Sequence, residues 1–195
     1  MSFEDLNIED ITFCPDRDNG SGLKCRLYYA PEDFFFHIPM PIPDKSYASE
    51  IIVPDEILVK SGRSVRYIDI LINENELKSA INGSIGKQKL KTSLQFFIPG
   101  FTASVIGFIQ RTINIPFVFF IQDSIGQNWQ IGHSRNRAFI ENADLTSGKV
   151  YEDNSGAAVS VNCNSPILYY PFSLDHIAIP GDFNNDFNND FFVFI

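Results

Sequence analysis

The histidine and serine side chains are those that could perform catalysis, and their spacing supports no catalytic site. The three histidines, His37, His133 and His176, are scattered, and none lies at metal-ligand spacing from another histidine, a cysteine or a carboxylate. No serine stands in the Gly-x-Ser-x-Gly sequence that presents a nucleophile. We therefore expect a protein that is not an enzyme and has no catalytic residues.

Cysteine chemistry is equally poorly supported. Cys14, Cys25 and Cys163 make an odd count, and no pair has the Cys-x-x-Cys spacing of zinc and redox sites. Free cysteine often behaves as a small apolar residue. We expect these thiols to be buried or incidental, without a disulfide framework or a zinc site.

Two short segments resemble ligand-binding loops without matching them. Residues 83–88, GSIGKQ, lack the spacing of a phosphate loop, and a predicted strand follows them instead of a helix. Residues 182–189 repeat Asp-Phe-Asn-Asn and are rich in oxygen ligands, but they lack the glycine and closing glutamate of a calcium loop. We expect no metal and no cofactor, and interpret the repeat as a solvated or partner-binding segment.

Residues 133–137, HSRNR, form a small basic cluster in an acidic chain. Two interpretations remain open. The cluster is either a solvated loop with ion pairs, or a contact to an acidic patch on a neighbouring subunit.

Composition limits the classes of partner. The chain has 195 residues and a net charge of −9, which argues against a protein that grips phosphate backbones with clustered lysine and arginine. With 44% hydrophobic residues and 19 phenylalanines, it either folds compactly or buries aromatic side chains against partners. The acidic start shows no signal peptide, and no apolar run is long enough to span a membrane. We expect synthesis in the cytoplasm and no membrane association.

Hydrophobic periodicity predicts many short strands and one helix. Residues 101–114 form the predicted helix, with Thr102 as its N-cap. Residues 73–84 read as a helical turn or a loop, and residues 133–155 as a mostly polar stretch. The predicted strands are residues 23–29, 64–72, 87–98, 115–121, 129–131 and 159–161.

These elements predict a mainly β fold, a β-sandwich or curved barrel with one flanking helix at about 101–114. Residues 1–12 are predicted to be a flexible lead-in to a β-rich domain at 13–165. Within that domain, residues 30–64 form a long proline-rich loop. Residues 166–195 read as an appended aromatic C-terminal arm.

The proline-rich loop and the C-terminal arm share apolar side chains that follow no regular core-facing period. We therefore predict that both segments contact neighbouring subunits. The predicted self-assembly residues are Phe34, Phe35, Phe36, Ile51, Ile52, Tyr169, Tyr170, Phe187, Phe191 and Phe192.

Four groups of turn and strand residues follow one another in order along residues 12–163. The groups are Cys14, Gly20 and Gly22 before residues 24–29; residues 87–98 before the helix 102–114; residues 117–121 before Asp123, Gly126, Trp129 and Gly132; and Thr146, Gly148, Asp153 and Gly156 before residues 159–161. In this order the chain resembles a family of small virion proteins of tailed phages and prophages of Bacteroidetes, which look like tail tube or tail-ring subunits.

The resemblance implies a virion structural protein that self-assembles into sixfold rings of a tail tube or connector. Its partners would be copies of itself and neighbouring tail or connector proteins, and its location the virion tail. DNA would pass through the ring without specific binding. The lysines of residues 87–91 lie on one strand face, and we expect them outward or in ion pairs between subunits instead of lining the bore.

The main alternative is a carbohydrate- or receptor-binding β-sandwich on a virion or cell surface. In that case Trp129, Tyr169 and Tyr170 would stack on sugar rings. Aromatic residues in β proteins more often fill the core, which disfavours this alternative.

Overall fold

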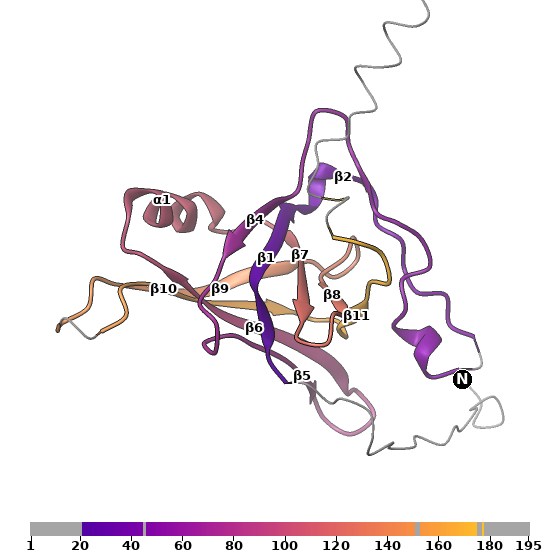
Figure 1. The fold of residues 1–195 in the computed structure, drawn as a ribbon. Coiled ribbons are helices and arrows are strands. Elements are labelled where there is room, and N and C mark those ends of the chain that lie inside the picture. Colours follow the sequence, from indigo (N-terminus) through magenta and orange to yellow (C-terminus); the bar gives the residue numbers. More distant parts are fainter. Residues whose placement is uncertain (1–20, 45, 151–152, 175–176, 178–195) are drawn as a thin grey trace, which may run out of the picture.

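The computed structural model describes residues 21–44, 46–150, 153–174 and 177, and in these residues the fold is mainly β with one α-helix (Figure 1). This confirms the predicted fold class, although the main sheet does not close into a barrel. Nine antiparallel strands form that sheet, and two short strands form a second one. The main-sheet strands are β1 (Leu23–Pro31), β4 (Arg66–Asp69), β5 (Glu76–Asn82), β6 (Lys89–Pro99), β7 (Phe117–Asp123), β8 (Asn128–Ile131), β9 (Ala138–Thr146), β10 (Gly156–Cys163) and β11 (Leu168–Tyr169).

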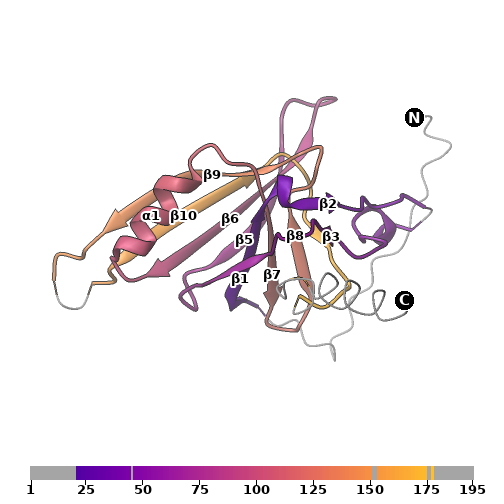
Figure 2. The ribbon, with the colours of Figure 1, turned by 90° about the horizontal axis from the view of Figure 1, so that it is seen from above.

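The main sheet consists of two parts that meet at one residue pair. One part has the order β5-β6-β10-β9, and the other contains β4, β1, β7, β8 and β11. Strand β9 pairs with β7 only at Ala138 and Phe117. Figure 2 shows β6, β9 and β10 running at a large angle to β1, β7 and β8. The first core, with side chains from β1, β6, β7, β8 and β10, lies between the two parts.

Strand β7 is buried on both of its faces. Phe117, Phe119 and Ile121 belong to the first core, whereas Val118 and Phe120 belong to a second core on the opposite face. Alternate residues of a strand point to opposite faces, so a strand covered on both sides must be apolar throughout. This explains the uninterrupted apolar run that the sequence shows at this position.

The second core is built by the proline-rich segment and by residues after β11. Phe35 in β2 (Phe35–His37) and Val53 are buried there, together with Tyr170 and Leu174. Strand β3 (Leu58–Val59) pairs with β2, and two 3-10 turns, η2 (Glu32–Phe34) and η3 (Ala48–Glu50), complete this covering layer. The layer buries the face of β7 that carries Val118 and Phe120.

Residues 166–174 differ from the predicted appended arm, because they are part of the packed body. Strand β11 pairs with β8 through Leu168 and Tyr169. Leu168 is buried in the second core next to Tyr170. Aromatic density in this segment therefore reflects core packing, and residues 178–195 lie outside the described residues.

The helix α1 (Ala103–Thr112) confirms the predicted helix and its cap. The Thr102 hydroxyl accepts a hydrogen bond from the Val105 backbone N–H at 3.3 Å, which satisfies one of the unpaired amides of the first turn. Phe108 packs edge-to-face on Tyr29 of β1, with ring centroids 5.4 Å apart. The helix is thereby held against the first core.

Strands β5 and β9 were not predicted, and both are largely exposed to solvent. Residues 73–84 read as a helical turn or loop, but β5 pairs with β6 along its whole length. In β9, a register shift opposite Ser160 and Val161 interrupts the alternation of buried and exposed residues. These strands form because they pair with a more buried neighbouring strand, and such pairing cannot be predicted from the propensities of their own residues.

Gly132, at the start of the β8–β9 connection, occupies a position that admits no side chain. Its φ is +89°, and a Cβ atom there would lie 2.8 Å from the Phe117 carbonyl oxygen and 3.0 Å from the Ala138 backbone nitrogen. These are the two residues through which β7 pairs with β9. The joint between the two parts of the sheet therefore requires glycine.

We predict that Gly132→Ala lowers the free energy of unfolding by at least about 2 kcal/mol, because it adds both backbone strain and a steric clash at the joint. The matched control is Gly107→Ala in α1, where a Cβ atom meets nothing within 4 Å. That change should raise stability by about 0.5–1 kcal/mol. Urea denaturation measures both, and equal stability of Gly132→Ala and the wild type would contradict the account of the joint.

Candidate functional site

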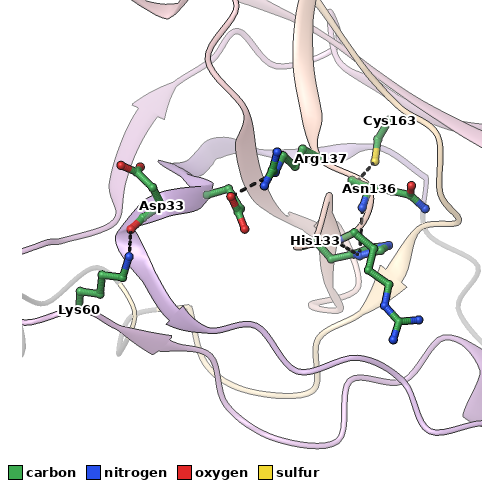
Figure 3. Close-up of polar contacts among 8 residues, drawn as sticks. Asp33, Lys60, His133, Asn136, Arg137 and Cys163 are labelled. Carbon is green, nitrogen blue, oxygen red and sulfur yellow. Dashed lines mark hydrogen bonds and ion pairs between the residues drawn. The ribbon is translucent and has the colours of Figure 1, made fainter.

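The residues of the 133–137 loop that could do chemistry are engaged in a polar network, shown in Figure 3. We call Glu32, His133, Asn136, Arg137 and Cys163 the polar corner. His133 is 3% exposed, and its Nδ1 accepts hydrogen bonds from the backbone N–H groups of Arg135 at 3.1 Å and Asn136 at 3.4 Å. The backbone N–H of His133 donates to the Asn136 carbonyl at 3.0 Å. These bonds fix the loop that links β8 to β9.

Cys163 anchors the same loop from β10. Its thiol donates to the Asn136 carbonyl at 3.2 Å and lies 3.1 Å from the Ser165 hydroxyl. Burial raises the pKa of the Cys163 thiol, which disfavours the thiolate that a nucleophile needs. The predicted role of this cysteine as a buried thiol is confirmed.

His133 is held in its neutral form. Burial, with a further contribution from the neighbouring Arg135, lowers the pKa of His133. Two backbone N–H groups donate to Nδ1, which is the atom that would otherwise accept a proton. The polar corner is thus arranged for structure and offers no nucleophile and base in contact.

Arg137 forms an ion pair within the chain. Its Nε lies 3.1 Å from Glu32 Oε2, and the Glu32 backbone N–H donates to the Pro116 carbonyl at 2.9 Å. The pair ties the polar corner to the proline-rich segment beside the start of β7. Of the two interpretations of the basic cluster, the loop with ion pairs describes Arg137.

Arg135 does not share this pairing and lines an open groove of about 460 Å³ with Lys91, Glu141 and Asn162. The lining combines both signs of charge, so it favours no single ligand. In the described residues, no three His, Cys, Asp or Glu side chains come together to hold a metal ion.

The predicted self-assembly residues are distributed over the core and the surface. Phe35 and Tyr170 are buried in the second core, where the chain's own residues cover them. Phe36 is 77% exposed. The half-buried members are Phe34, Ile51, Ile52 and Tyr169, whereas Phe187, Phe191 and Phe192 lie outside the described residues. Of the described members, Phe36 alone offers a mostly free apolar side chain.

Two further apolar side chains of the proline-rich segment are also exposed. Ile42 is 72% exposed, and Leu58 on the paired strand β3 is more than half exposed. We call Phe36, Ile42 and Leu58 the excursion surface. These residues belong to the same proline-rich segment whose buried side chains, such as Phe35 and Val53, contribute to the second core.

A second exposed apolar group was not predicted. Ile81 in β5, Ile85 in the turn and Leu90 in β6 are all exposed. The alternation of residues 87–98 assigns Leu90 to the core side, and this assignment is correct for the face. The alternation does not indicate how far along β6 other residues cover that face.

The aromatic residues proposed for sugar stacking are used in internal packing. Trp129 Nε1 donates to Asp123 Oδ2 at 2.9 Å, and its ring packs edge-to-face on Tyr169 at 5.6 Å. Asp123 Oδ1 also accepts from the backbone N–H groups of Ile125 and Gln127, so Trp129 helps to close the β7–β8 turn. This arrangement does not favour the carbohydrate-binding alternative.

Comparison with known proteins adds no relative. No protein family model matches the chain, and neither the curated proteins nor the solved structures contain a significant match. Among the described residues, no helix has the length and apolarity required to cross a membrane.

The lowered pKa of His133 predicts a dependence of stability on pH. Because the unfolded chain takes up this proton at about pH 6.5 and the folded chain only at lower pH, the free energy of unfolding falls as pH decreases through this window. His133→Asn should reduce this slope, since its amide oxygen does not titrate. Urea denaturation at several pH values measures it, with exposed His37→Asn as control, and an unchanged slope in His133→Asn would contradict the prediction.

Proposed function

We propose that this protein is a virion structural subunit that self-assembles into rings of a phage tail tube or a tail connector. The observation that carries the proposal is the open main sheet, whose end strand β5 is exposed at every residue except half-buried Leu77. Among the described residues, β5 pairs with β6 alone. The outer backbone groups of β5 are thus available to a further chain.

An exposed edge strand favours association unless charge, proline or covering segments prevent it. Lys78, next to the middle of β5, provides partial protection against uncontrolled pairing. Ring closure uses such edges in a finite, symmetric way. The exposed apolar side chains of the excursion surface are candidates for the contact between copies, because exposed apolar surface often marks an interface.

The polar corner supports a structural role over an enzymatic one. Its histidine and cysteine are both held in neutral form and are directed to backbone groups of a loop. The network joins β8, β9 and β10 to the proline-rich segment. A subunit that must fit into a regular assembly benefits from such fixed geometry.

The family resemblance of the sequence supplies the finer part of the proposal. It implies sixfold rings, contacts to neighbouring tail or connector proteins, and a location in the virion tail. The net charge of −9 supports a neutral or acidic bore, through which DNA passes without specific binding.

The purified full-length protein should form rings or larger tubular assemblies as its concentration rises. Sedimentation velocity should show discrete oligomers, and negative-stain electron micrographs should show particles with a central hole. A protein that sediments as a monomer at every concentration, with no rings in micrographs, would contradict the proposal.

Phe36→Ser should weaken self-association without loss of stability, because the side chain is exposed in the single chain and would be covered in the assembly. Phe35→Ala, one position earlier, should instead lower the free energy of unfolding by about 3–5 kcal/mol. Ile72→Ser, at an exposed apolar residue outside the excursion surface, serves as the matched control. Sedimentation and thermal unfolding separate the two effects, and unchanged association of Phe36→Ser would exclude the excursion surface from the contact.

A further inference from the structure

Charge is unevenly divided between two segments of the chain. Residues 77–122 contain no aspartate or glutamate, and four lysines fall within residues 78–91 of the β5–β6 hairpin. Residues 31–57, in contrast, contain six acidic residues and one lysine. A chain of net charge −9 therefore carries one hairpin whose residues 77–91 bear only basic charges, and one strongly acidic layer.

The end of the β5–β6 hairpin extends the core-facing side of the sheet beyond its cover. Leu77 pairs with Leu94, and Ile81 pairs with Leu90, so all four side chains lie on one face. Leu94 is fully buried, whereas Leu90 is 41% exposed and Ile81 is more exposed still. The first core ends between these two pairs and leaves an apolar pair uncovered.

The turn of the hairpin adds to this uncovered surface. Ile85 is 96% exposed and lies between Gly83 and Gly86, both of which have positive φ. We call Ile81, Ile85 and Leu90 the hairpin tip. Figure 2 shows the turn projecting from the body, separate from the proline-rich segment.

Lysines flank the hairpin tip along the chain, and their side chains have no partner in the described part of the chain. Lys87 precedes β6, and Lys89 faces the side of the sheet opposite to Leu90. The ion pairs found among the described residues, Arg26 with Asp69 and Arg137 with Glu32, lie elsewhere. Exposed apolar side chains with charged residues close by are common at protein interfaces.

The excursion surface has the complementary composition. Phe36, Ile42 and Leu58 supply exposed apolar side chains. The acidic residues of the same layer, Asp33, Asp44, Glu50, Asp55 and Glu56, are all exposed. If the two surfaces are brought together, exposed apolar side chains meet exposed apolar side chains, and the lysines of one copy come near the acidic residues of the other.

We propose that the hairpin tip of one copy docks on the excursion surface of a second copy, with Lys87 and Lys89 opposite the acidic residues around Asp55 and Glu56. The inference rests on the proposed self-assembly and names the surfaces that carry it. Because the two surfaces are different and lie apart on one chain, the contact is head-to-tail. Such a contact repeats from copy to copy and forms a ring where the rotation closes.

A second copy fits the hairpin tip better than DNA does. Phosphate groups would pair with the lysines but would leave Ile81, Ile85 and Leu90 without an apolar partner. Duplex binding is therefore the rival that the experiment must separate from self-association.

A charge-swap experiment on the full-length protein tests the contact. Lys87→Glu/Lys89→Glu and Asp55→Lys/Glu56→Lys should each weaken self-association by at least roughly tenfold, because like charges then face each other. An equimolar mixture of the two variants should recover association, since every mixed contact again has opposite charges. The matched control is Lys24→Glu/Lys149→Glu, which makes the same charge change outside both surfaces.

Sedimentation velocity provides the readout, thermal unfolding verifies that each variant folds, and a gel shift at moderate salt measures duplex binding. Wild-type assembly that persists in both variants would overturn the docking inference and leave the proposed function intact. Weakening without recovery in the mixture would also overturn it. A wild-type chain that remains monomeric would overturn both the docking inference and the proposed function. If Lys87→Glu/Lys89→Glu loses duplex binding while its self-association is unchanged, the lysines bind DNA and the docking inference is overturned.

Discussion

The burial of β7 on both faces is the constraint on which the rest of this structure depends. Phe117, Phe119 and Ile121 face the first core, and Val118 and Phe120 face the second. Full burial of an apolar side chain of this size contributes about 1.5–3 kcal/mol, so a single strand anchors both cores. Neither layer can be removed without exposing one face of β7 to water.

This constraint explains why a segment with four prolines at residues 31–43 packs on the body with only short regular elements, η2 and β2. Proline disfavours helix and central strand, yet the segment must cover the outer face of β7. It does so through a few inward side chains, such as Phe35 and Val53, and through the ion pair of Glu32 with Arg137. Other side chains of the segment, including Phe36, are exposed and available to the proposed contact. The same segment therefore serves folding on one side and supports the proposed contact on the other.

The elements that local sequence patterns specify could be predicted from the sequence, whereas strands that form only by pairing with a distant segment could not. Thr102 capped the predicted helix, and the apolar run at β7 and the turn at Asp123 lie where they were expected. Strand β5 was missed because only Leu77 on its core-facing side is half-buried, so burial imposes little alternation on this edge strand. Tyr170 was assigned to an arm because its burial depends on a covering layer more than a hundred residues earlier in the chain. The exposure of Leu90 depends on where the first core ends, which is a tertiary property.

Hydrogen–deuterium exchange of the full-length protein at low and high concentration tests the central claim most directly, because it separates a stable interior from surfaces covered only in the assembly. The account predicts that β7 amides are strongly protected at every concentration. It predicts that amides of the β5–β6 hairpin and of β2 and β3 gain protection as concentration rises. Protection of the hairpin and of β2 and β3 that stays unchanged with concentration would contradict the proposal that these surfaces join copies of the chain.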